Sequence, residues 1–387
     1  MRTGRQKLSA DRETVVGKNS LPIPTDFIYD ILLRLSPKYI ARCRCVSKLW
    51  ASILDREVFT DQFLKQSSTR PQLLFACTKD GKVSFFSSAQ PQNPDENSSP
   101  LTANYHMSLP FDHAFKISSS VSGLVCMGDV RRLNGMKTKV MVSVICNPST
   151  GQSFTLPRMN TRNKMGGIRS FFGHDPVEKQ FKVLSMTWSH CNPICEEHQV
   201  LTLETGKLSW RMIKCNVSHY PEFDHGCNSV CINGVLYYKA KPNVYSSSEE
   251  VMIICFDVRF EKFSFIKATK PFMGATLMNY KGKLASLTPG GSYFFGRENT
   301  SFEMRVLDDR EKEEWSKHSY KLPPQWQTAV TNSNIIFVGV TGSNEIVFSG
   351  HSPSNHPFYV FYYSLEKGTI RRVEFQGIGE FQKSRPF

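Results

Sequence analysis

The chain has 387 residues, 40% of them hydrophobic, which is enough apolar material for one small and one large domain with buried cores. Its formal net charge of +14, from 48 lysines and arginines against 34 acidic residues, favours partners that carry negative charge. The eleven cysteines follow no framework spacing, the N-terminus has no apolar signal segment, and the longest apolar runs are too short to span a membrane. We therefore expect reduced thiols, no membrane partner, and a location in the cytoplasm, the nucleus or both.

Residues 1–20 are polar and mix basic with acidic side chains, without an apolar period. A segment of this composition has too little hydrophobic surface to fold by itself, so we expect a disordered tail. The first structured element comes directly after it. Pro22 and Pro24 favour an extended entry, and Thr25 is the expected N-terminal cap of a helix.

Residues 21–54 predict three short amphipathic helices. The Ser36-Pro37 pair ends the first and begins the second, because proline suits the first turn of a helix and interrupts the helix before it. Ser47 is the expected cap of the third. The apolar residues at helical spacing are Phe27, Ile28, Ile31, Leu32 and Leu35, then Tyr39, Ile40, Cys43 and Val46, then Leu49, Trp50, Ile53 and Leu54. Fewer than about 40 residues rarely form a core that hides this much surface, so the segment either packs on the rest of the chain or docks on a partner protein.

The motifs decide between these two interpretations, because the segment resembles an F-box. The family pattern appears in order as Leu21-Pro22, Ile31-Leu32, Arg34-Leu35, Arg44-Cys45-Val46-Ser47-Lys48 and Trp50. Ser36 stands where the family usually has proline, although Pro37 follows directly. The resemblance covers about a tenth of the chain and implies binding to a Skp-type adaptor and, through it, to a cullin. The residues that it implies for adaptor binding are Leu21, Pro22, Ile31, Leu32, Leu35, Pro37, Ile40, Val46 and Trp50.

Residues 57–70 extend the helical part, so the F-box domain with its linker is expected at 21–70. From 71 to 387 the pattern changes to short β-type runs separated by turn signals about every ten residues, which is typical of an all-β domain. Examples of these runs are 72–77, 83–86, 140–145, 199–203, 251–256, 334–338 and 358–363. The expected fold class is therefore multidomain α + β, with a small all-α domain before a large all-β domain.

Polar turns recur between these runs, and each is followed by a strand that opens on an aromatic or aliphatic residue. The turns are 147–151, 175–179, 204–207, 257–262, 308–312 and 365–368, with further hairpins at Asn233-Gly234 and Lys281-Gly282. Asn, Asp and Gly suit such turns because they tolerate left-handed backbone angles or bond to their own backbone. The last three of the six lie about fifty residues apart, close to the length of a propeller blade. We expect a β-propeller, with a two-sheet sandwich as the alternative.

The same region is similar to the F-box-associated domain of plant F-box proteins. The similarity rests on NPSTG at 147–151, FFGHDP at 171–176, FKVL at 181–184, ING at 232–234, LDD at 307–309 with Trp315, and VEFQG at 373–377. In that family the second domain recruits a target protein. The resemblance therefore implies a substrate-recognition subunit of an SCF-type ubiquitin ligase. A scaffold that uses its F-box without ubiquitination is an alternative.

No motif indicates catalysis, because the chain lacks a G-x-S-x-G elbow, a Walker loop, a G-x-G-x-x-G after a strand and an H-E-x-x-H. We expect no enzyme activity and no cofactor. Two groups of residues have spacings short enough to supply zinc ligands, namely His190, Cys191, Cys195 and His198, and then Cys215, His219, His225, Cys227 and Cys231. Neither group has the C-x2-C spacing of a zinc knuckle, and both lie between predicted strands. The sequence therefore predicts no metal site.

Residues 130–169 contain eight basic residues and no acidic one, and most of them lie in predicted turns. Arginine holds phosphate or carboxylate with two hydrogen bonds. We expect Arg158, Arg162, Lys164 and Arg169 to bind an acidic or phosphorylated target. The alternative is that these loops bind nucleic acid, although the chain has no RRM, KH, zinc-finger or helix-turn-helix signature.

Overall fold

The computed structural model describes residues 24–91, 100–111, 116–118, 120–131, 140–161, 167–188, 197–204, 206–221, 229–242, 251–268, 274–290, 295–330, 335–350, 357–378 and 383–386. The expected N-terminal tail, residues 1–20, lies outside these ranges. The chain divides into two compact units, Met1–Thr69 and Arg70–Phe387. Among the described residues, no helix combines the length and the apolar character that crossing a bilayer requires.

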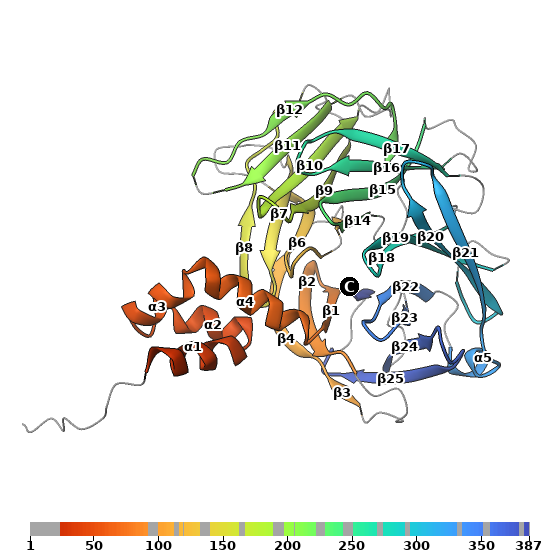
Figure 1. The fold of residues 1–387 in the computed structure, drawn as a ribbon, viewed down its shortest axis with the longest axis horizontal. Coiled ribbons are helices and arrows are strands. Elements are labelled where there is room, and N and C mark those ends of the chain that lie inside the picture. Colours follow the sequence, from red (N-terminus) through yellow and green to blue (C-terminus); the bar gives the residue numbers. More distant parts are fainter. Residues whose placement is uncertain are drawn as a thin grey trace, which may run out of the picture. The chain divides into compact units, whose positions relative to one another are not determined.

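The first unit contains the helices α1 (Thr25–Arg34), α2 (Pro37–Cys43), α3 (Lys48–Leu54) and α4 (Glu57–Ser68) (Figure 1). Pro37 opens α2 as expected, and Ser47 caps α3 by accepting a hydrogen bond of 3.2 Å from the Trp50 amide. The predicted cap at Thr25 is wrong. Helix α1 already includes Thr25, and the residue before it is Pro24, whose side chain offers no acceptor.

The four helices share a small core of their own. Its buried members are Ile28, Leu32, Cys43, Ile53, Leu54 and Phe59. The ring of Tyr29 on α1 meets the ring of Phe59 on α4 edge to face, with centroids 5.3 Å apart. Residues four apart on a helix lie on one face, so Ile28 and Leu32 form the inward stripe of α1. The helical part of the predicted fold class is confirmed.

The second unit is a β-propeller of six sheets, or blades, around a central axis (Figure 1). Blade 1 comprises β1 (Gln72–Lys79), β2 (Lys82–Ala89), β4 (Asn104–Pro110) and β26 (Lys383–Pro386); blade 2 comprises β5 (Lys116–Ile117), β6 (Val125–Arg131), β7 (Val140–Asn147) and β8 (Gln152–Thr155). Blade 3 comprises β9 (Gly167–Asp175), β10 (Gln180–Trp188), β11 (Glu197–Leu203) and β12 (Arg211–Ile213); blade 4 comprises β13 (Tyr220–Pro221), β14 (Ser229–Ile232), β15 (Val235–Lys241), β16 (Val251–Asp257) and β17 (Phe263–Ala268). Blade 5 comprises β18 (Thr276–Tyr280), β19 (Lys283–Pro289), β20 (Ser301–Asp309) and β21 (Glu314–Lys321); blade 6 comprises β22 (Ile335–Val340), β23 (Glu345–Gly350), β24 (Phe358–Ser364), β25 (Ile370–Gln376) and β3 (Leu101–Thr102). A short helix, α5 (Gln325–Ala329), lies between blades 5 and 6 in the chain. The propeller is confirmed, and the sandwich alternative is wrong.

Each blade buries both of its faces, because it has a neighbouring blade on each side. In β16, Ile254 and Phe256 belong to the core cluster shared with blade 3, whereas Ile253 and Cys255 belong to the cluster shared with blade 5. Successive side chains of a strand point to opposite faces, so a strand buried on both sides has a continuous apolar sequence. Six such clusters fill the six interfaces between blades.

The turns occupy the positions that the sequence predicts. Asn233, Gly234, Lys281 and Gly282 all have positive φ, between 49° and 82°, as tight hairpins between right-twisted strands require. The turn at 257–262 joins β16 to β17 in blade 4, the turn at 308–312 joins β20 to β21 in blade 5, and the turn at 365–368 joins β24 to β25 in blade 6. Their spacing of about fifty residues is therefore the repeat length of a blade.

The ring of blades closes at two places. Strand β26, from the C-terminal end, pairs antiparallel with β1, from Phe75 opposite Pro386 to Thr78 opposite Lys383. Strand β3, which lies between β2 and β4 in the chain, pairs in parallel with β25 of blade 6. A propeller whose ring is closed pairs its first and last strands in this way. Gly377 is required beside it, because its φ is 85° and a Cβ there would lie 3.0 Å from the Ala103 carbonyl oxygen.

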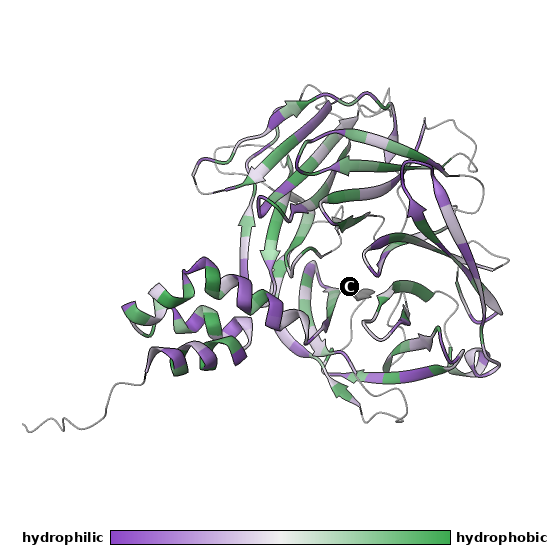
Figure 2. Cartoon of the chain, in the orientation of Figure 1, coloured by the Kyte–Doolittle hydropathy of each residue, from purple (hydrophilic) through white to green (hydrophobic). Residues whose placement is uncertain are grey.

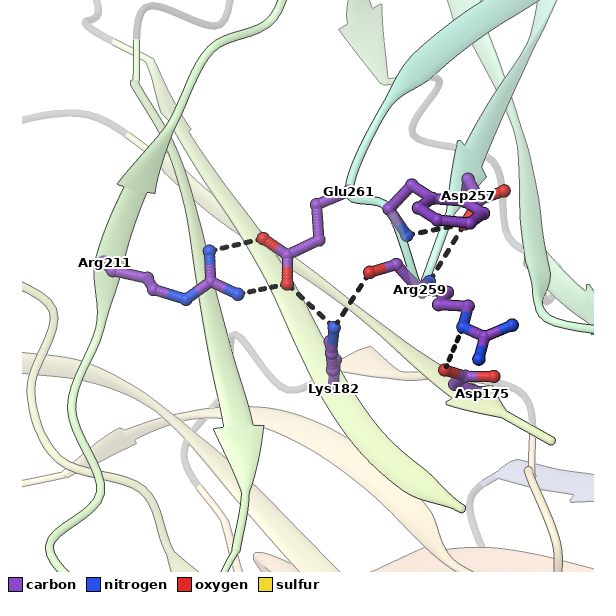
Figure 3. A network of polar contacts seen from close by, with 7 residues as sticks. Asp175, Lys182, Arg211, Asp257, Arg259 and Glu261 are labelled. Carbon is purple, nitrogen blue, oxygen red and sulfur yellow. Dashed lines mark hydrogen bonds and ion pairs between the residues drawn. The ribbon is translucent and has the colours of Figure 1, made fainter. Parts of the chain in front are cut away.

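A polar network joins blades 3 and 4 (Figure 3). Glu261, in the turn between β16 and β17, accepts a hydrogen bond of 2.8 Å from Lys182 of β10 and a bidentate pair from Arg211 of β12. Lys182 is only 7% exposed, so its ammonium group depends on this carboxylate. Burial alone raises the pKa of Glu261, but the hydrogen bonds from Arg211 and Lys182 outweigh burial and hold this pKa below its usual value.

The first prediction concerns this network. Glu261→Gln leaves the Lys182 ammonium buried without a counter-charge, so we expect the free energy of unfolding at neutral pH to fall by about 3 kcal/mol. The folded-state pKa of Glu261 is the lower one, so its contribution is fully present above the unfolded-state pKa and disappears as the pH falls through the folded-state pKa. Chemical denaturation at several pH values should show the difference between wild type and variant shrinking below about pH 4.

The control for that prediction is Glu178→Gln, because the side chain of Glu178 is 52% exposed and contacts Arg259 at 3.5 Å. An exposed pair of this kind contributes about 0–1 kcal/mol, so this variant should unfold almost as wild type does. An effect of Glu261→Gln that is equally large at every pH would contradict the ionic role.

The second prediction concerns ring closure. Phe375 of β25 is 2% exposed and its ring lies 5.1 Å from the ring of Phe75 in blade 1. We expect Phe375→Ala to cost about 3–5 kcal/mol of unfolding free energy, because it leaves a cavity between the first and last blades. Phe154→Ala, at a ring that is 53% exposed, is the control and should cost less than about 0.5 kcal/mol. Denaturant unfolding followed by tryptophan fluorescence measures both, and equal losses would show that this joint is not a packed core.

Candidate functional site

Helix α1 carries a second apolar stripe beside the one that it buries. Phe27 and Ile31 are four residues apart, and their side chains are 64% and 49% exposed. They lie next in sequence to Ile28 and Leu32, which fill the core of the helical unit. Because side chains four apart share a helix face, the stripe of Phe27 and Ile31 faces solvent as a unit.

Other large apolar side chains of the helical unit are exposed as well. Together with Phe27 and Ile31 they form what we call the outer apolar set, which consists of Phe27, Ile31, Tyr39, Val46, Leu49, Val58 and Leu64. Figure 2 shows hydrophobic positions along all four helices. Single exposed apolar residues are ordinary, but several in so small a unit, beside a core that is already complete, indicate a binding surface.

The turn between α2 and α3 fixes the orientation of Val46 and Leu49. The Val46 amide donates a hydrogen bond of 3.1 Å to the Cys43 carbonyl, and Ser47 next to it caps α3. Arg44 forms an ion pair with Asp55 at 3.0 Å, which connects the start of this turn with the end of α3. Val46 is 62% exposed and Leu49 is 48% exposed. These contacts fix the turn that carries Val46 and the first turn of α3 that carries Leu49, and both side chains are exposed to solvent.

The sequence-predicted adaptor residues differ in how far the structure exposes them. Ile31 and Val46 are exposed, whereas Leu35, Pro37, Ile40 and Trp50 are partly buried. Leu21 and Pro22 lie outside the described residues. Leu32 needs correction, because it is 0% exposed and packs in the core of the unit. Its position four residues after Ile28 makes it a core residue and not a contact residue.

Five members of the outer apolar set were missing from that prediction: Phe27, Tyr39, Leu49, Val58 and Leu64. The sequence signal for Phe27 is its spacing, because it precedes Ile31 by four positions on α1 and so shares its helix face. Helical spacing gives no such signal for Leu49, because Val46 lies in the turn before α3.

The predicted basic target surface also needs correction. Arg169 of β9 is 8% exposed, and its guanidinium lies over the ring of Phe171 with Cζ 5.4 Å from the ring centroid. It therefore cannot contact a target at the surface. Arg158 is exposed, and Arg162 and Lys164 lie outside the described residues. The run of basic residues in the sequence does not distinguish a strand residue, such as Arg169, from a loop residue.

Comparison with known proteins agrees with this division of the chain. Residues 21–62 match the F-box domain, and residues 72–386 match the F-box associated beta propeller domain. The chain belongs to the F-box proteins. It is 53% identical to the F-box protein DOR of Arabidopsis thaliana over 390 residues, covering 100% of this chain and 97% of DOR. It is 45% identical to the F-box protein At5g65850 of Arabidopsis thaliana over 398 residues, covering 99% of this chain and 95% of that protein.

Membership gives the two units of this F-box protein their general roles. F-box domains generally act in SCF ubiquitin ligases, where they bind Skp-type adaptors, and F-box proteins are typically non-catalytic. No catalytic family is indicated for the chain. The outer apolar set lies on α1 to α4, within or next to the matched F-box segment.

The third prediction separates core from surface on α1. Leu32→Ala should destabilise the helical unit by about 2–5 kcal/mol, because it removes a fully buried side chain. Ile31→Ala, one residue earlier and half-exposed, should change the stability of the unit by less than about 0.5 kcal/mol. Hydrogen exchange of the α1 to α4 amides in the full chain reports this local stability. Equal protection in the two variants would show that α1 does not use its faces differently.

Proposed function

We propose that this F-box protein is a substrate-recognition subunit of an SCF-type ubiquitin ligase. Its F-box docks on a Skp-type adaptor, and its propeller recruits a target protein for ubiquitination. The observation that supports the first step is the outer apolar set, and above all the pair of stripes formed by Phe27 with Ile31 and by Val46 with Leu49. Covering this surface with an apolar partner face removes it from water, which the unit cannot do with its own residues.

The propeller suits the recruitment of a target, because its strands are needed to build the ring whereas its turns can vary in sequence. Exposed turn residues such as Val177 and Phe260 stand on a framework whose blades are fixed on both faces. We propose that an acidic segment of the target contacts the basic residues Arg158, Arg162 and Lys164, of which Arg158 is exposed in the described part of the chain. Capture of such a target would then weaken in about half-molar salt, which screens exposed charges. We also propose that the protein acts in the cytoplasm, the nucleus or both.

The fourth prediction tests adaptor binding. In the full chain, Ile31→Glu with Val46→Glu places two charges in the proposed apolar interface, so we expect the affinity for a Skp-type adaptor to fall by at least about 30-fold, or roughly 2 kcal/mol. The control is Val177→Glu with Phe260→Glu, which changes two equally exposed apolar residues in turns of the propeller and should leave adaptor affinity unchanged. Binding of purified proteins to immobilised adaptor measures both variants.

The same variants distinguish a ligase subunit from a non-degradative scaffold. In cells, a target captured by the wild-type chain should accumulate when the Ile31→Glu, Val46→Glu variant replaces the wild-type chain. Proteasome inhibition should have the same effect. Wild-type chain that does not bind any Skp-type adaptor at micromolar concentration would refute the proposed function. Adaptor binding without any change in target level would support the scaffold instead.

A further inference from the structure

Three metal-ligating side chains from two separate sequence groups meet beside the interface of blades 3 and 4. They are His198 on β11 and Cys215 and His219 in the segment between β12 and β13, and their ligand atoms all lie within 4.8 Å of one another. The pairing of the strands brings them together, because His198 lies opposite Ile213, two residues before Cys215. Cys231 is not part of this cluster, and His190, Cys191, Cys195, His225 and Cys227 lie outside the described residues.

The cluster is buried and one of its nitrogen atoms has no partner. His198 is 5% exposed and His219 is 0% exposed, whereas Cys215 is partly buried. Among the described residues, no group lies within hydrogen-bond distance of Nε2 of His198. A buried polar atom without a partner costs about 1–3 kcal/mol, so an unoccupied site of this kind is unfavourable.

The other two side chains share a single acceptor. Nδ1 of His219 lies 2.7 Å from the Val217 carbonyl oxygen, and the Cys215 thiol donates to the same oxygen at 3.2 Å. A carbonyl oxygen only accepts, so the proton of His219 is on Nδ1, and Nε2 accepts from the Tyr238 hydroxyl at 2.8 Å. Sγ of Cys215 lies 4.0 Å from Nδ1 of His219.

Both imidazole rings are buried in the interior of the propeller. The rings are enclosed by aromatic neighbours, with His198 edge-on to Phe263 at 5.3 Å and His219 tilted against Tyr238 at 5.7 Å.

We propose that His198, Cys215 and His219 bind a zinc ion through Nε2, Sγ and Nδ1. Two imidazole nitrogens and one thiolate are typical zinc ligands, and they leave one position of a tetrahedron for a fourth donor. On binding, the Cys215 sulfur gives up its proton to solvent and donates the freed electron pair to zinc. His219 changes tautomer: its proton leaves Nδ1, Nε2 gains one, and Nε2 then donates to the Tyr238 oxygen, so that no net proton is lost at this ring. The hydrogen bonds from Nδ1 of His219 and Sγ of Cys215 to the Val217 carbonyl oxygen break in this step, because both atoms then direct an electron pair at zinc.

The position of the site suggests a structural role. Cys215 and His219 lie in the segment that leaves blade 3 and enters blade 4, while His198 belongs to a central strand of blade 3 and Tyr238 belongs to β15 of blade 4. An ion held by His198 and His219 would tie the crossing segment to blade 3. With metal bound, Nε2 of His219 would donate to the Tyr238 oxygen, and this hydrogen bond would connect the site to blade 4.

The fifth prediction is a metal analysis of the full chain, purified without chelator or added metal. We expect about one zinc ion per chain, and almost none in the double variant His198→Gln with Cys215→Ser. Cys231→Ser is the control and should keep its zinc, because the Cys231 thiol contacts the His174 carbonyl at 3.7 Å instead. Zinc that stays stoichiometric in the double variant, or copper in place of zinc, would overturn the proposal.

Cobalt reconstitution keeps the test decisive if the double variant does not fold. Stripped wild-type chain titrated with Co²⁺ should develop a thiolate-to-cobalt charge-transfer band, and Cys215→His should bind Co²⁺ without that band. Tyr238→Phe should weaken zinc binding by about 10- to 100-fold. If Tyr238 has only a structural role, the variant should change the melting temperature of the metal-free chain and leave the zinc affinity unchanged. A stripped chain that is folded by circular dichroism yet binds neither Co²⁺ nor Zn²⁺ at micromolar concentration would overturn the proposal.

Discussion

Closure of the ring is the constraint on which the large unit depends. Five of its interfaces join consecutive blades, but the interface of blades 6 and 1 joins residues from opposite ends of the domain, such as Phe75 and Phe375. Bringing these ends together costs loop-closure entropy, which the packing at this joint, the pairing of β26 with β1 and the pairing of β3 with β25 offset. Until the joint forms, an apolar face of blade 1 and one of blade 6 are exposed to water. The strands that consist of continuous apolar runs are therefore stable only in the closed ring.

Unlike the propeller, whose blades bury both apolar faces, the helical unit leaves large apolar side chains in solvent. Its inward residues, such as Ile28 and Leu32, fill a core without help, while Phe27 and Ile31 on the same helix are left in solvent. A helix whose only task was structural would carry polar residues on its outer face. The extra apolar stripe adds nothing to the core, which agrees with the proposal that a partner covers it. In one chain, the propeller uses apolar surface for its own stability, and we propose that the F-box uses it for binding.

Much of this organisation was predictable, and the failures have a common physical cause. Turn chemistry is local, so Asn233-Gly234 and the turn after Asp257 predicted their hairpins correctly. The F-box motif located the short N-terminal helices for the same reason. Burial is not local: Leu32 and Ile31 are adjacent and both apolar, and only the packing of α1 on the other helices decides which of the two is exposed. Arg169 sits in a basic run, yet the pairing of β9 with β10 and the ring of Phe171 place it inside. The sequence pattern shows where helices, strands and turns lie, whereas neighbours in space decide which side chains are exposed at the surface.

The interface of blades 3 and 4 buries charged and polar groups beside its apolar core. The interface of blades 5 and 6 is filled by rings such as Phe302, Phe348 and Trp326 and needs no compensation for charge. At blades 3 and 4, by contrast, Lys182 is buried and is neutralised by Glu261, which comes from the turn of the next blade. His198 is buried close by in the same blade, two residues before Val200 of the shared core, and its ring touches Phe263, two residues after Glu261. At this joint Lys182 thus has its partner within the chain, whereas His198 has an unpaired nitrogen close to a thiol and a second imidazole. The same physical demand, a counterpart for every buried polar atom, accounts for the ion pair and is the basis of the proposed zinc site.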